Sequence, residues 1–102
     1  MAITIRPLQA SDKPDWQYLW HDYLKFYDSA VTEDIYDITF ERLLSPQRAN
    51  QSAFLALIEN RAVGLVHYIY HPHNWKRENV CYLQDLYAVP ECRGQGIGRA
   101  LI

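Results

Sequence analysis

Apolar and polar residues are spaced differently in successive parts of the chain, and each spacing predicts a different element. Residues 2–8 alternate between apolar and polar side chains, as the residues of a half-buried strand do. Large apolar residues then recur at steps of three and four from Trp16 to Tyr27, which predicts an amphipathic helix of about four turns. A second helix is expected to begin after the capping residue Thr32 and to end at Pro46. The residues expected to face inward from it are Ile35, Ile38, Leu43 and Leu44.

The second half of the chain has the pattern of strands. Residues 52–58 and 62–71 are rich in β-branched and aromatic side chains. The connection Glu59-Asn60-Arg61 predicts a hairpin, because Asn tolerates a positive φ. Residues 80–89 predict one more strand, and a last helix is expected to begin near Gln95. The expected fold is α/β with the order β-α-α-β-β-β-α, in which a sheet of mixed, mainly antiparallel strands is flanked by helices.

The chain has 102 residues, so residues 1–102 are interpreted as a single domain. Its last helix ends soon after it begins and is too short to bury an apolar stripe well. We therefore expect residues 1–102 to be the N-terminal portion of a longer domain. A sheet this small would also leave an edge bare, which would allow a homodimer.

Three alternating glycines, Gly94, Gly96 and Gly98, stand between the last strand and the last helix. Glycines let a backbone approach a ligand closely, and a helix N-terminus offers free N–H groups. Together they predict a cradle for a phosphate or pyrophosphate. The dinucleotide pattern requires a third glycine where Arg99 stands, and the phosphate-binding loop requires Lys and then Ser or Thr. The pattern that remains is Arg-x-x-Gly-x-Gly, which begins at Arg93.

Residues 85–98, DLYAVPECRGQGIG, resemble the acetyl-CoA signature of the GNAT superfamily of N-acetyltransferases. The expected order of elements is similar to the first two thirds of that fold. Residues 63–70 and 82–86 resemble the diamine (spermidine/spermine) acetyltransferase branch. The resemblance covers the whole chain and is sharp from residue 63 onward. It implies a truncated GNAT-like acyl-CoA N-acyltransferase fold, with acetyl-CoA as co-substrate.

The resemblance also implies which residues bind acetyl-CoA. In this superfamily the strand before the motif splays from its neighbour, and pantetheine pairs with its exposed backbone groups, much as an added strand would. The backbone amides of the glycine turn then surround the pyrophosphate, and arginines add charge-assisted hydrogen bonds. The implied cofactor-binding residues are Leu86, Tyr87, Ala88, Arg93, Gly94, Gln95, Gly96, Ile97, Gly98 and Arg99.

Acetyl transfer requires a neutral amine, and Gln84 and Asp85 are the candidate catalytic residues. Diamine acetyltransferases commonly carry Glu-Asp at these two places, but Gln84 cannot accept a proton. Strand alternation would point Asp85 to the face opposite Gln84, where it would either cap a backbone group or hold substrate. His67 is expected to be a hydrogen-bonded, partly buried residue rather than a base. In the superfamily a Tyr on a later helix often protonates the leaving thiolate, which would place that acid beyond residue 102.

An acidic run between residues 28 and 41 contains no Lys or Arg and lies where the superfamily borders its amine site. It would attract a cationic amine, or it is an ordinary solvated helix face. The candidate substrate-binding residues are Tyr27, Glu33 and Asp34. The implied function is acetyl transfer from acetyl-CoA to a primary amine, polyamine-like or lysine-like. The alternatives are a protein lysine or N-terminal acetyltransferase and a non-catalytic CoA-binding or scaffold domain.

Composition argues against several other classes of protein. The net charge of −2 does not predict a nucleic-acid surface, and the apolar runs are too short to span a bilayer. Cys81 and Cys92 are too few for a disulfide framework, and we expect a cytoplasmic protein with both thiols reduced. His71 and His73 lack a third ligand at suitable spacing, so no metal site is expected.

Overall fold

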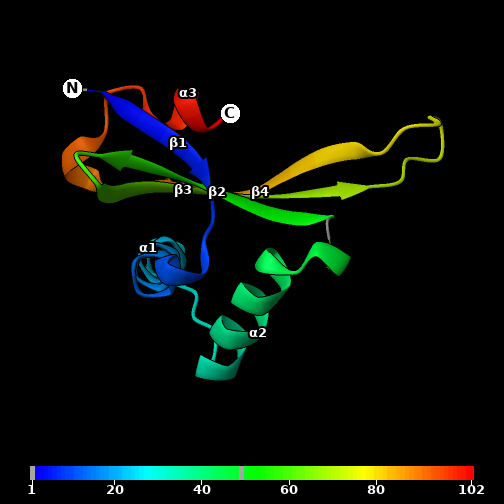
Figure 1. Ribbon diagram of the computed structural model, residues 1–102, viewed down its shortest axis with the longest axis horizontal. Helices are drawn as coiled ribbons and strands as arrows, with labels where there is room; N and C mark the ends of the chain where they lie inside the picture. The colour runs from blue at the N-terminus through cyan, green and yellow to red at the C-terminus, as the bar shows by residue number, and fades with distance from the viewer. Residues whose placement is uncertain (1, 49) are drawn as a thin grey trace.

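The computed structural model describes residues 2–48 and 50–102, and its centre is a four-stranded sheet (Figure 1). The strands are β1 (Ile3–Pro7), β2 (Gln51–Ile58), β3 (Arg61–His71) and β4 (Val80–Ala88). They lie in the order β1-β2-β3-β4, and each pairs antiparallel with the next. The expected order of elements is confirmed, and the pairing between these strands is antiparallel throughout rather than mixed.

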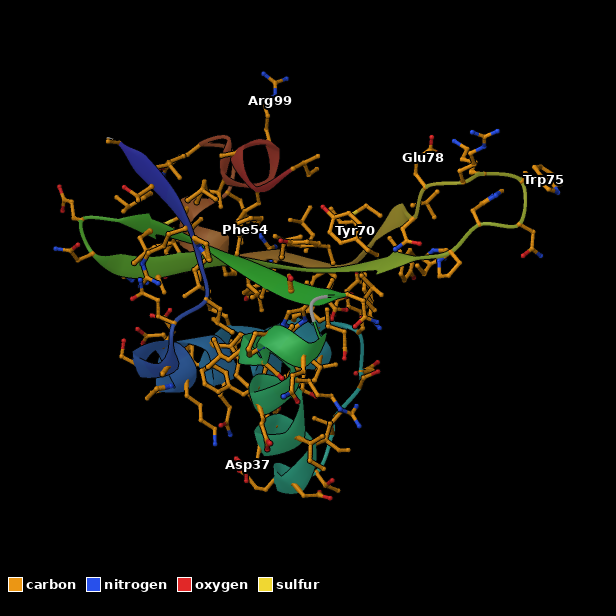
Figure 2. The ribbon with its side chains drawn as sticks, turned by 45° about the vertical axis from the view of Figure 1, so that its right-hand side comes forward. Asp37, Phe54, Tyr70, Trp75, Glu78 and Arg99 are labelled. Atoms are coloured by element: carbon orange, nitrogen blue, oxygen red, sulfur yellow. The ribbon has the colours of Figure 1, made fainter. Side chains whose placement is uncertain are left out.

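Helices cover both faces of the sheet. Helices α1 (Lys13–Phe26) and α2 (Glu33–Leu44) lie on one face, and the short helix α3 (Ile97–Leu101) lies on the other (Figure 1). Beyond the helices, β3 and β4 continue as a long hairpin that extends away from the body of the molecule. Trp75, at the tip of this hairpin, is 90% exposed (Figure 2).

Aromatic rings form the core between the sheet and helices α1 and α2. Trp16 and Trp20 of α1 are buried and lie 5.3 Å apart between ring centroids. Tyr36 and Phe40 of α2 pack edge-on or tilted against Trp16. The expected inward face of α2 was therefore wrong in part, because Ile35 and Ile38 are 37% and 39% exposed. The prediction considered the aliphatic residues of this helix, whereas the larger rings of Tyr36 and Phe40 remove more apolar surface from water than an isoleucine does.

An ion pair fixes the start of α1 to β1. Both guanidinium Nη atoms of Arg6 donate to Asp12, at 2.6 and 2.8 Å, and the backbone N–H of Gln9 donates to Asp12 Oδ2 at 2.7 Å. The Asp12 side chain is only 7% exposed. The hydrogen bonds from Arg6 are the main reason why the pKa of Asp12 is lowered. This buried carboxylate orients the helix that carries Trp16 and Trp20.

The turn between β2 and β3 is tighter than expected. Only Glu59 and Asn60 connect the strands, with φ of 52° and 67°, and Arg61 already belongs to β3. Two successive residues at positive φ are typical of the turn that matches the twist of a two-residue hairpin.

On the next part of β3, Gly64 allows α3 to pack closely, because a Cβ there would lie 2.6 Å from Ile97 Cγ2.

No helix in the described part of the chain is long and apolar enough to cross a membrane.

Candidate functional site

Strand β4 forms one edge of the sheet, and part of its backbone faces away from β3. The N–H of Val89 donates to the carbonyl of Val63 at 2.9 Å, so the backbone groups of Val89 point toward β3. Because these directions alternate along an antiparallel strand, the N–H and C=O groups of Leu86 and Ala88 point outward. The strand therefore offers main-chain donors and acceptors along its free edge.

The glycine turn follows this edge directly. Gly94 and Gly96 have φ of 85° and 84°, a left-handed conformation that side chains disfavour. A Cβ added at either position would meet no described atom within 4 Å, so neither glycine is required by internal packing. Helix α3 begins at Ile97, with Gly96 as its cap residue, slightly later than the expected start near Gln95. The turn thus presents bare backbone to open space.

A cleft of about 460 Å³, here called the edge cleft, lies between this turn, β4 and the end of α1. Its walls combine the outward-facing strand, the glycine backbone and aromatic side chains of α1. Its lining residues are Tyr23, Phe26, Tyr27, Leu86, Tyr87, Ala88, Arg93, Gly94, Gly96, Ile97 and Gly98. Most of the expected cofactor-binding residues, and Tyr27, are therefore gathered around one space.

Arg93 lies across the edge cleft. Its Nε donates to the outward-facing carbonyl of Ala88 at 2.9 Å. Its guanidinium carbon lies 5.7 Å from the ring centroid of Phe26 and 5.5 Å from that of Tyr87. Stacking between two rings holds a guanidinium in place at little cost, because it is weakly hydrated. The arginine places a positive charge inside the cleft.

A second cleft, here called the helix cleft, has a volume of about 250 Å³ and lies between helices α1 and α2 and strands β3 and β4. Its walls combine apolar and polar side chains, and Asp85 is the carboxylate among its lining residues. These residues are Trp20, Val31, Ile35, Thr39, Leu43, Gln51, His67, Tyr68, Ile69, Gln84 and Asp85.

Gln84 and Asp85 both line the helix cleft, which corrects the expectation that they lie on opposite faces. The register of β3 and β4 shifts here, since His67 pairs with Asp85 whereas Tyr68 pairs with Leu83. Gln84 is the extra residue of a β-bulge and has no partner position on β3. A bulge interrupts the strict alternation of side chains and can turn two neighbouring residues the same way. The sequence carried no signal for it.

Asp85 is held in a chain of buried polar groups between the two clefts. Asp85 Oδ2 lies 2.8 Å from His67 Nδ1, and the indole N–H of Trp16 donates to His67 Nε2 at 2.9 Å. Side-chain exposure is 5% for His67 and 14% for Asp85. Burial first, and then hydrogen bonding with the Asp85 carboxylate, raises the pKa of Tyr23 to about 12. Tyr23 therefore stays protonated over the ordinary pH range.

Other expected site residues lie elsewhere. Arg99 projects from α3 into solvent, away from the sheet (Figure 2), and Gln95 is an exposed residue of the glycine turn. Glu33 and Asp34 begin α2, where Glu33 accepts a hydrogen bond from Gln17 and Asp34 one from Thr32. In the same acidic run, Asp37 pairs with Lys13 of α1 and lies far from the sheet (Figure 2). None of the acidic residues of this run is among the described lining residues of either cleft.

Sequence reasoning missed the roles of Trp16, His67 and Tyr23. It expected His67 to be hydrogen-bonded but named no partner for this residue. These residues are far apart in the chain, and only the antiparallel register of β3 and β4 sets His67 opposite Asp85.

Within residues 2–48 and 50–102, no group of three or more His, Cys, Asp or Glu side chains could hold a metal ion.

Comparison with known proteins gives both a family and a set of structural neighbours. Residues 12–102 match the model of the acetyltransferase (GNAT) family. The D-amino-acid N-acetyltransferase HPA3 of Saccharomyces cerevisiae is 31% identical over 101 residues, which are 98% of this chain and 63% of the yeast protein. The chain thus spans less than two thirds of the length of this curated relative.

Solved structures of acetyltransferases share the fold. The ribosomal-protein-alanine N-acetyltransferase of Brucella melitensis biovar Abortus 2308 superposes with a TM-score of 0.81 at 23% identity, over 99% of this chain and 67% of that one. AAC(6')-Iy, in complex with the bisubstrate analogue CoA-S-monomethyl-acetylneamine, superposes with a TM-score of 0.83 at 18% identity, again over 99% and 67%. The expected fold class is confirmed.

Proposed function

The chain belongs to the acetyltransferase (GNAT) family, and on that premise we propose that it transfers an acetyl group from acetyl-CoA to a primary amine. The observation that carries the proposal is the edge cleft, where a free strand edge meets a turn of bare glycine backbone. The transfer itself is proposed for the protein that contains these residues, since the chain spans 63% of the yeast relative.

The edge cleft fits the co-substrate in two respects. The outward N–H and C=O groups of Leu86 and the outward N–H of Ala88 suit an extended arm with amide groups, which would pair with them as a strand does. Positive φ at Gly94 and Gly96 leaves room where a Cβ would otherwise block a phosphate. Arg93 adds a positive charge to the same cleft. When bound there, acetyl-CoA would supply an acetyl thioester, an activated form of the acyl group.

The helix cleft suits the amine. Asp85 would hold a cationic amine, because an ionised carboxylate has more acceptor positions than the one that His67 uses. Gln84, beside it in the same cleft, can hydrogen-bond an amine but cannot take its proton. Tyr23 keeps its own proton, because its pKa is raised to about 12. We therefore assign Asp85 to hold the amine. The proton that the amine loses would pass to Asp85 or to water.

A small polyamine-like or lysine-like amine is our first proposal for the substrate. The carboxylate of the helix cleft recognises one ammonium group, and the apolar part of its walls suits a short methylene chain. Where the diamine branch commonly carries a second carboxylate, this chain has Gln84, so a second ammonium group would be recognised less well. Acetylation of a protein lysine or N-terminus is the second candidate, since it presents the same amine chemistry.

Two measurements test the proposal. Calorimetry with acetyl-CoA reports on the edge cleft, and a thiol-release assay over monoamines, diamines, lysine and a lysine peptide reports on transfer. We expect Asp85→Asn to bind acetyl-CoA like the parent protein and to lose about 100-fold or more in kcat/KM, the usual scale of a catalytic carboxylate. Binding without turnover of any amine would instead favour a non-catalytic CoA-binding domain. No binding in a folded protein would overturn the proposal.

A further inference from the structure

His67 is a buried histidine whose two ring nitrogens are both engaged. Its Nε2 lies 2.9 Å from the indole nitrogen of Trp16, and its Nδ1 lies 2.8 Å from Asp85 Oδ2. Trp16 is fully buried, and the His67 ring also packs against Trp20 at 5.3 Å between centroids. The imidazole is therefore held by a neighbouring ring as well as at both nitrogens.

The partners determine where the ring proton sits. An indole N–H is a donor and never an acceptor, so His67 Nε2 must offer its lone pair to Trp16. A neutral imidazole carries one N–H, which is then on Nδ1 and points at Asp85. A second proton on Nε2 would set two N–H groups against each other inside the core. The indole thus excludes His67 from acting as a base and leaves it one role, as a donor to Asp85.

We propose that His67 is a positioning residue, fixed by Trp16 in the Nδ1–H tautomer, which orients the Asp85 carboxylate toward the amine while leaving its negative charge intact. The proposal rests on the proposed function, because the carboxylate that His67 orients is the one assigned to hold the amine. It goes beyond that function because it assigns roles to Trp16 and His67, to which the proposed function gives none. The same carboxylate beside a protonated histidine would form an ion pair and attract an ammonium group less.

The tautomer can be measured without any activity. In ¹⁵N-labelled protein, long-range ¹H–¹⁵N correlation spectra distinguish a ring nitrogen that carries a proton from one that does not. We expect His67 to show a protonated Nδ1 and an unprotonated Nε2, as its two partners require. A protonated Nε2 would overturn the proposal even if the protein is a fully active acetyltransferase.

A matched pair of variants tests the role in catalysis. His67→Asn keeps a side-chain N–H near the position of Nδ1, whereas His67→Phe keeps the ring shape and has no donor. Both remove the nitrogen acceptor that serves Trp16, so they share that structural cost. We expect kcat/KM to fall about tenfold further in His67→Phe than in His67→Asn, as for one hydrogen bond to a charged group. Equal kcat/KM in the two folded variants would overturn the proposal.

The indole is tested by removing its N–H alone. Replacing Trp16 with 3-benzothienylalanine keeps the bicyclic shape and puts sulfur in place of the N–H, which avoids the cavity that Trp16→Phe would leave. Without the indole donor, His67 is no longer confined to the Nδ1–H tautomer, so the long-range ¹H–¹⁵N spectrum should change and the KM for a cationic amine should rise, with acetyl-CoA affinity unchanged. An unaltered tautomer and KM in the substituted protein would contradict the role of Trp16.

Discussion

The edge cleft and the helix cleft are both lined by residues of β4, but they are built from different groups. The edge cleft offers backbone groups, from the outward edge of β4 and from the glycine turn, together with the charge of Arg93. The helix cleft takes its polar character from side chains, above all from Asp85 and the partners that hold it. The first is built mainly from one continuous segment, β4 and the glycine turn, with the end of α1 as its other wall, whereas the second requires both α1 and α2 to dock on the sheet.

This difference determines what each cleft can recognise. Backbone groups recognise whatever has the shape of an extended amide chain and a phosphate, so a cleft of this kind suits a co-substrate common to many proteins. Side chains can be exchanged one at a time without altering the fold, so a cleft made of them suits a substrate that differs between relatives. The two clefts therefore need not change together when such a chain diverges.

The largest effect is expected at the glycine turn. Gly96→Val should weaken acetyl-CoA binding at least 100-fold, because a β-branched residue disfavours φ of 84° and its side chain would enter the space left for phosphate. Calorimetry with acetyl-CoA measures the loss, and circular dichroism verifies that the sheet is intact.

Gly98→Ala is the matched control for Gly96→Val. Gly98 is not among the glycines at positive φ, and a Cβ there would make an ordinary contact at 3.8 Å with Leu86 Cδ2. It should bind acetyl-CoA nearly as well as the parent protein. Equal losses in the two variants would show that any side chain on this turn is harmful, and that the backbone conformation at Gly96 is not the cause.

The sequence could predict the edge cleft because its signals are local. Alternating glycines after a strand imply a particular backbone shape, and the structure places Gly94, Gly96 and Gly98 along the cleft that this shape requires. The order of elements could be predicted for the same reason, since strand and helix spacing are local patterns. What the glycines hold stays a prediction.

The helix cleft could not be predicted to the same depth. The β-bulge at Gln84 depends on the register in which β4 pairs with β3. The hydrogen bond from Trp16 to His67 joins residues that are 51 positions apart in the chain. The acidic run of α2 suggested a substrate site by composition alone, but Lys13 and Gln17 of α1 engage its members. Side-chain sites of this kind require tertiary contacts that periodicity does not encode.

A smaller effect is expected where α1 is attached to the sheet. Asp12→Asn should lower the free energy of unfolding by about 2 kcal/mol, because Arg6 loses a charged partner that is largely buried. The folded-state pKa of Asp12 is lowered, so the ion pair stabilises the protein above the unfolded pKa of 3.8 and loses this contribution as the pH falls. Urea unfolding should show a constant difference from the parent above about pH 5, and a shrinking one below it.

Glu91→Gln supplies the control for Asp12→Asn. It breaks the ion pair between Arg61 and Glu91, whose side chains are 61% and 57% exposed. Solvent screens such a pair, so the midpoint of unfolding should be close to that of the parent protein. If Asp12→Asn is equally mild, α1 does not depend on Arg6 for its position, and the helix cleft is less dependent on tertiary contacts than we argue.

The smallest effect is expected from a charge added to the helix cleft. Because the bulge turns Gln84 to the same cleft as Asp85, Gln84→Glu should lower the KM for a diamine a few-fold relative to a monoamine of equal length. The change is modest because Gln84 is exposed, and it should diminish as salt is added. Asn74→Asp, on the exposed hairpin between β3 and β4, makes the same change in net charge away from both clefts and should leave the ratio of KM values unaltered. If the two variants alter that ratio equally, the effect is one of overall charge, and the amine is not recognised beside Asp85.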